Sequence, residues 1–363
     1  MKFIIAGGGT GGHVFPAIAT ADAIKEQQPQ AEILFVGSKN YMEMELVPKA
    51  GYEIVGMNIY RMNRTGWWKN YKQPFQVLIA LFQSYKLINK FKPDAVIGTG
   101  SFACFPIVKM AQLKGIPTFI QEQNAYPGIA VRLLAGKTKR IHTAFKEIDG
   151  FIGSEKTMLT GNPVRQDIVK QLPDKKVSLN KLGLSQNKPT LAIIGGSRGA
   201  EPINKAIVKM MPELEKLNIQ VYLQTGKKLY EPYKNLESKN LKITPFIDDI
   251  PTILAAADVI ITRAGAITIS ELALVGKTSI LIPDTYSEQG HQDNNAQALA
   301  DEKACIYIQE KDMDKKLLNA ITKLFIDKDY SQKLGKNLTK FAFPNAARDI
   351  AGDVLNFLTK NQE

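Results

Sequence analysis

The hydrophobic pattern of this chain consists of short aliphatic runs that end in glycines and lead into helical patterns. Residues 259–261, Val-Ile-Ile, form the kind of β-branched run that a buried parallel strand uses. Gly265 breaks this run just before the helical spacing of Ile267, Leu272 and Leu274. The stretch therefore predicts a strand, a tight turn and a helix.

The predicted turn has the features of a phosphate site. The first turn of a helix offers unpaired backbone N–H groups and the positive end of the helix dipole, and both attract phosphate. Glu271 stands about one and a half turns into the helix, within reach of a ribose beside that phosphate. The alternative is that Gly265 only permits close helix packing and that Glu271 is a solvated helix acid.

The start of the chain repeats this arrangement. Residues 2–6 predict a strand, and residues 7–13, Gly-Gly-Gly-Thr-Gly-Gly-His, satisfy GxGxxG between that strand and a predicted helix. A dinucleotide-binding unit would also place an acid at the end of its second strand to hold the ribose. The second predicted strand, residues 33–36, ends instead in Gly37-Ser38-Lys39. This ending argues against NAD but not against a phosphate.

Similar alternations continue through both halves of the chain, which predicts an α/β protein with two Rossmann-like doubly wound domains. Further strands are expected at residues 95–97, 118–120, 190–194, 219–223 and 241–243. A boundary is expected near residues 161–165, so that the domains are residues 1–162 and 163–342. Phe343-Pro344-Asn345 interrupts the last helices, and the helix at about 343–363 is predicted to pack back on the first domain.

Composition and charge restrict the class of protein further. The chain of 363 residues is 44% hydrophobic with two cysteines, so we expect a globular protein of a reducing compartment, without a disulfide framework. No apolar run approaches the roughly 18 residues of a membrane span, which predicts a soluble or peripheral protein. The net charge of +12 favours an anionic partner, but no RNA-binding or helix-turn-helix pattern is present, so nucleic acid is disfavoured.

One basic and aromatic connection differs from the rest. It contains Trp67 and Trp68, and Pro74 then begins a helical stripe formed by Phe75, Leu78, Ile79, Phe82 and Tyr85. Such a stripe is typical of a core, and the tryptophans could belong to ordinary loop packing. Aromatic and basic residues side by side also suit an anionic membrane surface, so the region from Trp67 to Phe82 is a candidate membrane contact.

Glycine-rich and polar motifs are spread over the whole chain: Gly9-Thr10-Gly11-Gly12-His13, Gln121-Glu122-Gln123-Asn124, Asn162-Pro163-Val164-Arg165, residues 195–200, Arg263-Ala264-Gly265-Ala266 with Glu271, and His291-Gln292 with Asn295-Ala296. Together they resemble the motifs of the MurG family, in glycosyltransferase family 28. The resemblance implies a GT-B fold, with two domains facing across a cleft. It also implies transfer of N-acetylglucosamine (GlcNAc) from UDP-GlcNAc to the lipid-linked muramyl pentapeptide, lipid I, which gives lipid II with inverted stereochemistry.

The resemblance further implies a location and a donor site. The protein is expected on the cytoplasmic face of the bacterial cell membrane as a peripheral protein, with other cell-wall synthesis proteins as candidate partners. The diphosphate is expected on Ser197 and on the backbone of Ala264, Gly265, Ala266, Ile267 and Thr268. Remaining donor contacts are expected from Glu271 for the ribose, Ile247 for the uracil edge, Gln292 and Asn124 for the sugar, Arg165 beside the nucleotide, and Thr10, Gly11 and Gly12 from the first domain.

Two positions depart from the family pattern. The second loop, expected at residues 101–106 and implied to contact the acceptor pyrophosphate, contains less glycine than is usual in the family. Arg198 stands where glutamine is frequent, either as an additional cation for the phosphate or as a solvated side chain.

Inverting transfer needs a base for the acceptor hydroxyl, and His13 is the candidate. It follows the first glycine-rich turn at a predicted helix N-terminus, where the dipole disfavours imidazolium and leaves the ring able to accept a proton. The alternative is a histidine that hydrogen-bonds a loop carbonyl without transferring a proton. No cofactor and no catalytic metal are expected, because capping and solvation account for the paired acids at residues 312–314 and 327–329.

Two other classes of function are compatible with parts of this pattern. A UDP-GlcNAc 2-epimerase of similar architecture would need acid and base residues around the sugar but no lipid surface, so the region of Trp67 and Trp68 discriminates between the two functions. A dinucleotide-binding oxidoreductase is disfavoured by the missing acid after Val36.

Overall fold

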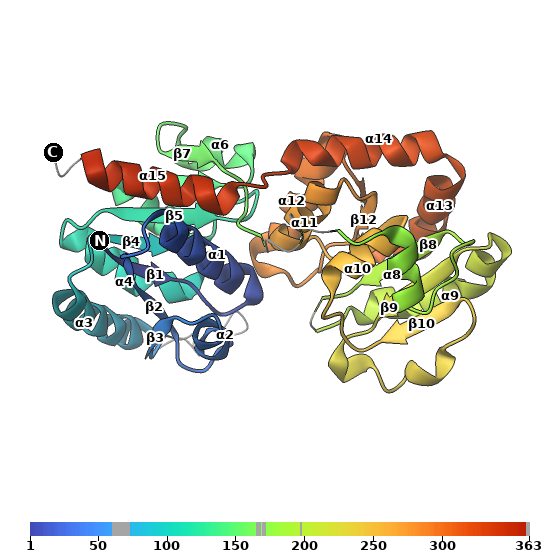
Figure 1. Cartoon of the computed structure of the whole chain (residues 1–363), viewed down its shortest axis with the longest axis horizontal. Coiled ribbons are helices and arrows are strands. Elements are labelled where there is room, and N and C mark those ends of the chain that lie inside the picture. Colours follow the sequence, from blue (N-terminus) through green and yellow to red (C-terminus); the bar gives the residue numbers. More distant parts are fainter. Residues whose placement is uncertain (60–72, 165–167, 169–171, 197, 361–363) are drawn as a thin grey trace. The chain divides into compact units, whose positions relative to one another are not determined.

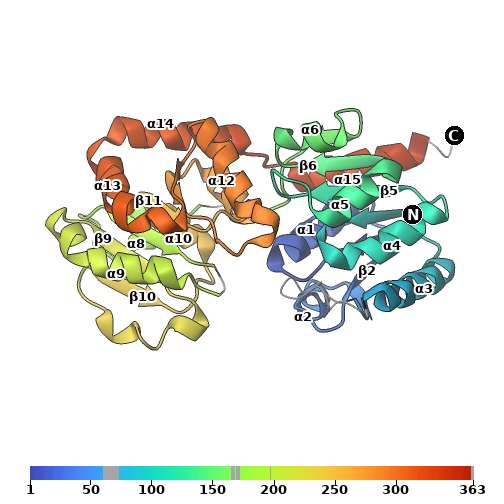
Figure 2. The same cartoon turned by 180° about the vertical axis from the view of Figure 1, so that it is seen from behind.

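The computed structural model describes residues 1–59, 73–164, 168, 172–196 and 198–360. The chain forms two compact units, the first made of Met1–Arg165 with Phe343–Glu363 and the second of Gln166–Ala342. Each unit has a parallel β-sheet with helices on both faces (Figure 1; Figure 2 shows the reverse view). The predicted α/β class, with two doubly wound parallel sheets, is confirmed.

The first unit has a seven-stranded sheet in the order β3-β2-β1-β4-β5-β6-β7. Its strands are β1 (Lys2–Ala6), β2 (Glu32–Ser38), β3 (Glu53–Met57), β4 (Ala95–Gly98), β5 (Thr118–Glu122), β6 (Arg140–Thr143) and β7 (Thr157–Leu159). Its α-helices are α1 (Gly11–Gln27), α2 (Glu43–Lys49), α3 (Gln73–Phe91), α4 (Ser101–Leu113), α5 (Ile129–Leu134), α6 (Asp149–Ile152) and α15 (Ala346–Lys360).

Alternating side chains of the central strands build two separate cores in this unit. Phe3 and Ile5 of β1 pack with α1, α2 and α15, whereas Ile4 and Ala6 of the same strand pack with α3, α4 and α5. This division follows from the two-residue period of a strand, which sends successive side chains to opposite faces. Both faces are covered, which explains why the strands read as continuous apolar runs.

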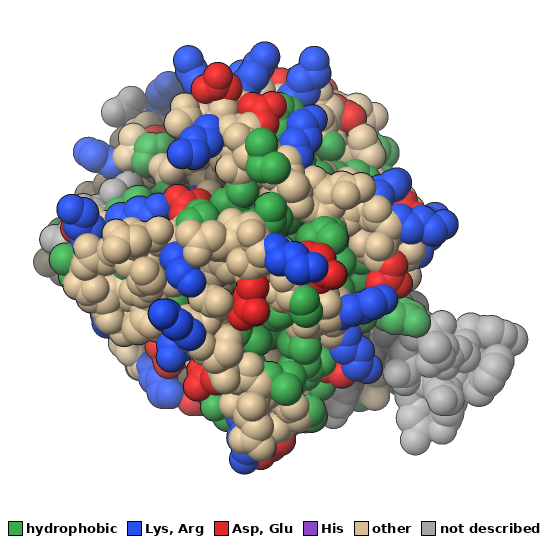
Figure 3. Space-filling model, turned by 90° about the vertical axis from the view of Figure 1, so that its right-hand side faces the viewer, with side chains coloured by type: hydrophobic (Ala, Val, Ile, Leu, Met, Phe, Trp, Pro, Cys, Tyr) green, Lys and Arg blue, Asp and Glu red, His purple; other side chains and the backbone are tan. Residues whose placement is uncertain are grey.

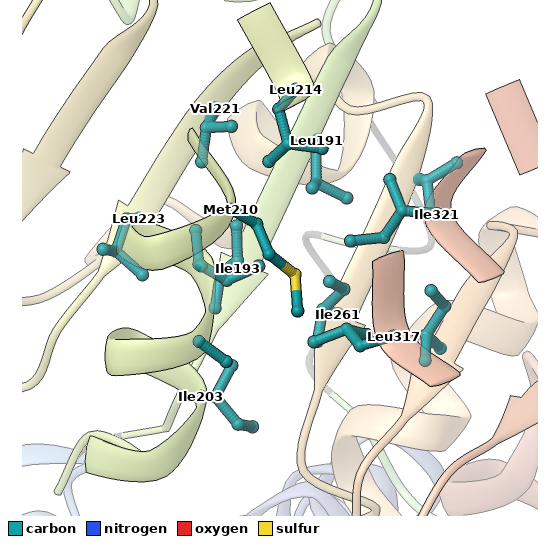
Figure 4. Packing of buried hydrophobic residues seen from close by; sticks show 14 of the residues in the cluster. Leu191, Ile193, Ile203, Met210, Leu214, Val221, Leu223, Ile261, Leu317 and Ile321 are labelled. Carbon is teal, nitrogen blue, oxygen red and sulfur yellow. The ribbon is translucent and has the colours of Figure 1, made fainter. Parts of the chain in front are cut away.

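The second unit has a six-stranded sheet in the order β10-β9-β8-β11-β12-β13. Its strands are β8 (Thr190–Ile194), β9 (Gln220–Gln224), β10 (Leu241–Thr244), β11 (Val259–Thr262), β12 (Ser279–Leu281) and β13 (Ile306–Tyr307). Its described α-helices are α8 (Lys175–Lys181), α9 (Glu201–Lys216), α10 (Ile250–Ala256), α11 (Ala266–Val275), α12 (His291–Asp301), α13 (Met313–Ile326) and α14 (Lys328–Leu338). Figure 4 shows Leu191 and Ile193 of β8 packed among side chains of α9 and α13.

In each sheet the strand order reverses at one place. In the first sheet this is between β1 and β4, where Ala6 pairs with Gly98, and in the second it is between β8 and β11, where Ile194 pairs with Thr262. Ligands of open α/β sheets bind outside the carboxyl ends of the strands at such a reversal. We call residues 7–13 with 99–101 the first switch point, and residues 195–200 with 263–266 the second switch point.

The last helix completes the first unit. α15 packs against α1, and the side-chain amide of Gln27 donates a hydrogen bond to the carbonyl oxygen of Arg348 (3.1 Å). His142, fully buried in β6, has its Nε2 3.0 Å from Oδ2 of Asp353 in α15. The two residues are 211 positions apart in the chain, so neither one indicates the other in the sequence.

Two expectations about local structure are wrong. Residues 101–106 are the first turns of α4 rather than a loop, and the turn before them is only Thr99 and Gly100. The stripe on α3 is not core: Phe75, Leu78 and Phe82 are 69%, 62% and 57% exposed. We call the exposed side chains of Phe75, Leu78, Ile79, Phe82 and Tyr85 the α3 apolar face.

The surface charge is mixed on the side of the molecule that Figure 3 draws. Basic and acidic side chains alternate there with hydrophobic and neutral ones. This distribution is that of ordinary solvated helix faces. Among the described helices, none combines the length and the apolar composition that a membrane span requires.

Candidate active site

The first switch point holds His13 in a defined orientation. Its Nδ1 lies 2.8 Å from the carbonyl oxygen of Thr99, and the Thr99 hydroxyl donates to the carbonyl oxygen of His13 (2.9 Å). A carbonyl oxygen only accepts, so Nδ1 carries the proton and donates it. In the neutral ring Nε2 is therefore the nitrogen with the lone pair, which is the form that a general base requires.

Gly100 makes this orientation possible. Its φ of +85° lies in the region that favours glycine, and a Cβ there would lie 3.0 Å from Nδ1 of His13. The same Cβ would lie 3.2 Å from Oε1 of Gln123, whose amide nitrogen donates to the Thr99 carbonyl oxygen (2.7 Å). The carbonyl that orients His13 is thus itself fixed by a buried amide.

Buried side chains extend this network along the carboxyl end of β5. Gln121 donates to Oδ1 of Asn162 (2.8 Å), and the Asn162 amide donates to the carbonyl oxygen of Gln123 (3.2 Å). Glu122, also buried, accepts from the backbone and side-chain nitrogens of Asn124 (2.9 and 3.0 Å) and from the Gly128 N–H (2.9 Å). Glu122 therefore shapes the turn that presents Asn124 at the edge of this site.

Glu43 contacts the first switch point, and the sequence did not indicate this role. Its side chain is fully buried, and its two carboxylate oxygens accept from the backbone N–H groups of Gly9 and Ser38, each at 2.9 Å. A Cβ on Gly8 would lie 2.1 Å from this carboxylate, so a glycine is required there. Glu43 follows β2 by five residues, close to where a dinucleotide-binding protein keeps its ribose acid, but here its oxygens hold the glycine-rich turn.

Cys104 lies beside this site without being reactive. Its Sγ is 3.2 Å from the carbonyl oxygen of Ser101, and the side chain is fully buried. Burial raises the pKa of the Cys104 thiol to about 12. The thiolate that a nucleophile requires is therefore not formed at neutral pH.

The second switch point is built on a close approach of two backbones. Gly199 has a φ of +76°, and a Cβ there would lie 1.9 Å from the carbonyl oxygen of Thr225. The Gln224 amide donates to the carbonyl oxygen of Gly196 (3.0 Å), and the buried Asn204 amide donates to the Thr225 carbonyl oxygen (3.0 Å). Neutral amides therefore hold this turn against β9, whereas a carboxylate holds the first one.

The helix at the second switch point begins in a way that suits an anion. Gly265 occupies the N-cap position of α11 and brings no side chain to cap it, and the first turn of α11 contains no acid. The Asn295 amide donates to the carbonyl oxygen of Ala264 (3.2 Å), which fixes the turn from α12. The Arg263 guanidinium donates a hydrogen bond to the carbonyl oxygen of Pro283 (2.8 Å) and forms an ion pair with the carboxylate of Glu310 (2.5 Å). No acid in the first turn of α11 therefore offsets the positive end of the helix dipole.

Glu271, Ile247 and Gln292, three further predicted donor residues, belong to the same unit. Glu271 is 6% exposed in α11, so its interpretation as a solvated helix acid is wrong. The side chain of Ile247, after β10, is also buried. Oε1 of Gln292 accepts from the backbone N–H of Asp284 (2.9 Å), which ties the start of α12 to the segment after β12. Arg198 is exposed.

Some predicted residues cannot be placed from the structure. Arg165, Ser197, Trp67 and Trp68 lie outside the described residues. Thr10, Gly11 and Gly12 lie at the start of α1, where Thr10 is the N-cap residue and its hydroxyl makes no capping hydrogen bond. Within the described part of the chain, no cluster of three or more His, Cys, Asp or Glu side chains is arranged to hold a metal ion.

The paired acids have other roles in the structure. Asp312 accepts from Nζ of Lys316 (2.8 Å), and this hydrogen bond holds the pKa of the Asp312 carboxyl below its usual range. Asp327 caps α14 by accepting from the backbone N–H of Tyr330 (2.9 Å). Capping is thus confirmed for Asp327, whereas Asp312 pairs with a lysine and makes no capping hydrogen bond.

Comparison with known proteins identifies the class of enzyme. Residues 3–143 match the model of the glycosyltransferase family 28 N-terminal domain, and residues 190–350 match that of the family 28 C-terminal domain. The chain belongs to glycosyltransferase family 28. It is therefore a glycosyltransferase, and the resemblance found in the sequence is confirmed.

Two individual proteins are similar to the chain over nearly its whole length. The chain is 42% identical over 358 residues to a protein of Flavobacterium psychrophilum, with 98% of each chain covered. That relative is named UDP-N-acetylglucosamine--N-acetylmuramyl-(pentapeptide) pyrophosphoryl-undecaprenol N-acetylglucosamine transferase. A crystal structure of MurG from Acinetobacter baumannii superposes with a TM-score of 0.79 at 26% identity, covering 98% of this chain and 99% of that one.

The architecture is shared beyond the family. A UDP-GlcNAc 2-epimerase from Neisseria meningitidis superposes with a TM-score of 0.69, covering 98% of this chain and all of the other. Its sequence identity is 16%, so this likeness shows the fold alone.

Proposed function

We propose that this chain transfers GlcNAc from UDP-GlcNAc to lipid I and so forms lipid II for peptidoglycan synthesis. The observation that carries the proposal is the match over nearly the whole length to the Flavobacterium psychrophilum transferase. The two switch points support it, since one presents an oriented histidine and the other a helix N-terminus suited to a diphosphate.

Most of the donor contacts are assigned to the second unit. The diphosphate of UDP-GlcNAc would lie on Ser197 and on the backbone of residues 264–268, where the N-terminus of α11 supplies favourable partial charge. Glu271 would accept hydrogen bonds from the ribose hydroxyls. Because the side chain of Ile247 is buried, its contact with the uracil edge would come from the backbone. Gln292 and Asn124 would contact the sugar, with Arg165 beside the nucleotide.

The acceptor step is assigned to His13. Nε2 takes the proton of the acceptor hydroxyl while that oxygen attacks C1 of GlcNAc, and the bond from C1 to the diphosphate oxygen breaks with its electrons passing to UDP. Attack from the face opposite the leaving group inverts the configuration at C1. Thr99 fixes the ring through Nδ1, so the base is oriented before the acceptor binds. The mechanism requires no metal, because the N-terminus of α11 and Arg165 meet the charge of the leaving UDP.

The α3 apolar face is the proposed membrane contact. Five large side chains on one helix are exposed, and Lys86 and Lys114 lie over the rings of Phe82 and Tyr85, at 4.6 and 4.8 Å from the ring centroids. An apolar face bordered by lysines suits the anionic cytoplasmic face of the membrane, where the lipid-linked acceptor is held. Attachment there would make the protein peripheral.

A donor-selectivity assay tests the proposed function. Purified protein is given labelled UDP-GlcNAc or labelled UDP-GalNAc together with a water-soluble, short-chain lipid I analogue. We expect transfer of label to the acceptor from UDP-GlcNAc only, with UDP as the other product. Conversion of UDP-GlcNAc into its 2-epimer without transfer would overturn the proposal and favour an epimerase, and hydrolysis without an acceptor product would also overturn it.

A further inference from the structure

The carboxyl end of β13, an edge strand of the second sheet, leads to an acid that the proposed reaction does not use. Glu310 begins the single 3₁₀ turn after this strand, and its Oε2 lies 2.5 Å from a terminal guanidinium nitrogen of Arg263. The side chains of Arg263 and Glu310 are 15% and 20% exposed. Water therefore screens this ion pair less than it screens a pair on the open surface.

Arg263 connects two segments of the proposed donor site. Its backbone directly precedes Ala264, where the segment proposed to hold the diphosphate begins. Its guanidinium donates to the carbonyl oxygens of Ile282 (3.2 Å) and Pro283 (2.8 Å), which follow β12. A planar guanidinium holds these carbonyls and a carboxylate at the same time, in a geometry that a lysine ammonium does not reproduce. Arg263 thus joins the diphosphate segment to the segment after β12.

The segment after β12 in turn orients the amide of Gln292. The backbone N–H of Asp284, the residue after Pro283, donates to Oε1 of Gln292 (2.9 Å). Because the amide oxygen accepts this hydrogen bond, the NH₂ group is the part of the amide that can donate to a sugar hydroxyl. Gln292 is one of the residues proposed to contact the sugar. The position of the carbonyls bound by Arg263 therefore affects where these N–H donors lie.

The start of α12 has a separate connection to the end of β13. The Tyr307 hydroxyl donates to Oδ1 of Asp293 in the first turn of α12 (2.9 Å), and the Gln309 amide donates to that hydroxyl (3.2 Å). These contacts do not involve Arg263. Loss of the ion pair is therefore expected to shift residues 282–284 and the Gln292 amide while α12 itself stays in place.

The carboxylate of Glu310 keeps the Arg263 charge on the side of β12. A largely buried guanidinium that loses its ion-pair partner is destabilised where it lies, and it moves toward water or toward another anion. A diphosphate on the backbone of residues 264–268 would be such an anion. Without Glu310, the guanidinium would thus leave the two carbonyl oxygens, whereas attraction for the diphosphate would not decrease.

We infer that Glu310 is a positioning residue for the donor sugar. Through Arg263 it holds the carbonyl oxygens of residues 282 and 283, and so places the Gln292 amide against the sugar of UDP-GlcNAc. The inference rests on the proposed function, which assigns the donor sugar to Gln292. It adds a residue that acts on the donor through another side chain.

Three changes and a matched control separate this role from general support of the fold. Glu310→Ala removes the carboxylate, and Glu310→Gln keeps the shape of the side chain without its charge. Arg263→Lys keeps the positive charge but not the planar fork. The control is Asp312→Ala, because Asp312 lies in the same 3₁₀ turn, is partly buried and pairs with Lys316 (2.8 Å). Thermal unfolding of each variant shows that it remains folded.

The first measurement is a calorimetric titration with UDP and with UDP-GlcNAc. Because UDP has no sugar for Gln292 to contact, we expect Glu310→Ala to bind UDP no more weakly than the unchanged protein does. It should bind UDP-GlcNAc at least about tenfold more weakly, with a smaller loss for Glu310→Gln and none for Asp312→Ala. Equal weakening of both ligands would overturn the inference, since Glu310 would then support the whole site. An unchanged affinity of Glu310→Ala for UDP-GlcNAc would overturn it too.

The second measurement tests whether Glu310 acts through Arg263. The same titrations are made with Arg263→Lys and with the double variant Arg263→Lys, Glu310→Ala. We expect the double variant to lose less affinity for UDP-GlcNAc than the product of the two separate factors, because both changes break one interaction. Factors that simply multiply would show that Glu310 acts without Arg263, which would overturn the inference.

The role of Glu310 and the proposed function fail in different assays. The titrations need no acceptor, whereas the proposed function is tested by transfer to the lipid I analogue. A selective loss of UDP-GlcNAc affinity in Glu310→Ala, with no transfer by the unchanged protein, would count against the proposed function alone. Transfer by the unchanged protein, with equal UDP-GlcNAc affinities for Glu310→Ala and Asp312→Ala, would count against the inference alone.

Discussion

The two switch points have the same backbone plan and different side chains. In each, a glycine-rich turn follows the central strand and leads into a helix, α1 in the first and α9 in the second. In the first, the turn is held by the buried carboxylate of Glu43, and the imidazole of His13 is held by Thr99. In the second, the turn is held by the neutral amides of Gln224 and Asn204.

The difference between a carboxylate and neutral amides suits the two switch points to different roles. A carboxylate already on the N–H of Gly9 makes the first turn a poor place for another anion, because like charges repel. The amide-held turn at residues 195–200 leads into α9, which has Glu201 in its first turn. α11, which begins after the other turn of the same switch point, has no acid in its first turn and lacks that obstacle. The same strand-turn-helix unit thus suits an oriented base in one half and a diphosphate in the other.

The largest effect is expected where the second turn touches β9. Gly199→Ala places a Cβ 1.9 Å from the Thr225 carbonyl oxygen at a φ of +76°, so the backbone has to move. We expect it to lower the free energy of unfolding of the second unit by about 3 kcal/mol. Gly196→Ala is the matched control, since its φ is +77° but nothing lies within 4 Å, and it should cost only about 1 kcal/mol. Equal losses in denaturant titrations would show that the close approach is unimportant.

A smaller loss is expected at the carboxylate of the first turn. Glu43→Gln keeps the shape of the side chain but turns an N–H₂ group toward one of the two N–H donors now bound by the carboxylate. This should lower the free energy of unfolding of the first unit by about 2 kcal/mol. Glu45→Gln, on the exposed side of the same helix, should leave it unchanged. If Glu43→Gln behaved like Glu45→Gln in denaturant titrations, the resident carboxylate would not hold the turn.

The smallest of the three stability effects concerns α15, which only the first unit has. The hydrogen bond from His142 holds the pKa of the Asp353 carboxyl below its usual range, with Arg140 contributing. Because the folded pKa lies below the unfolded one, this stabilisation is present above the ordinary aspartate range and disappears as the pH falls through the lowered value.

Asp353→Asn should therefore cost about 1 kcal/mol at neutral pH, since it removes the ionised partner of buried His142. Denaturant titrations at pH 7 and pH 3 are compared for the variant, the unchanged protein and Asp349→Asn, an exposed acid of the same helix. The unchanged protein should lose more stability between these pH values than Asp353→Asn does. A constant difference between the two at both pH values would show that Asp353 does not contribute through its charge.

Much of the fold could be predicted because its signals are local. The apolar runs at residues 2–6, 190–194 and 259–261 are buried strands, and the glycines that follow them are the turns. Each strand is covered on both faces, so its composition alone indicates it. The two switch points could be found in the same way, since a strand, a glycine-rich turn and a helix are consecutive in the chain.

The parts that were missed depend on contacts between distant residues. Glu43 is 34 residues from Gly9, and in the sequence it resembles any acid at the start of a surface helix. Asp353 is 211 residues from His142, so nothing near either residue indicates the pair. The error at residues 101–106 has another cause: the family resemblance implied a loop there, but the chain turns at Gly100 and continues as a helix. For Glu43 and Asp353, the fold brings together residues that are far apart in the sequence.

The central claim is that His13 at the first switch point is the base, and its replacement tests this most directly. His13→Ala is assayed with UDP-GlcNAc and the soluble lipid I analogue, both at saturation, and the donor KM is measured alongside. Because a positioned base contributes about 10²- to 10⁴-fold, we expect kcat to fall by at least about tenfold while the donor KM stays close to that of the unchanged protein. An unchanged kcat would remove His13 from the chemistry, and a raised donor KM at constant kcat would place it in donor binding instead.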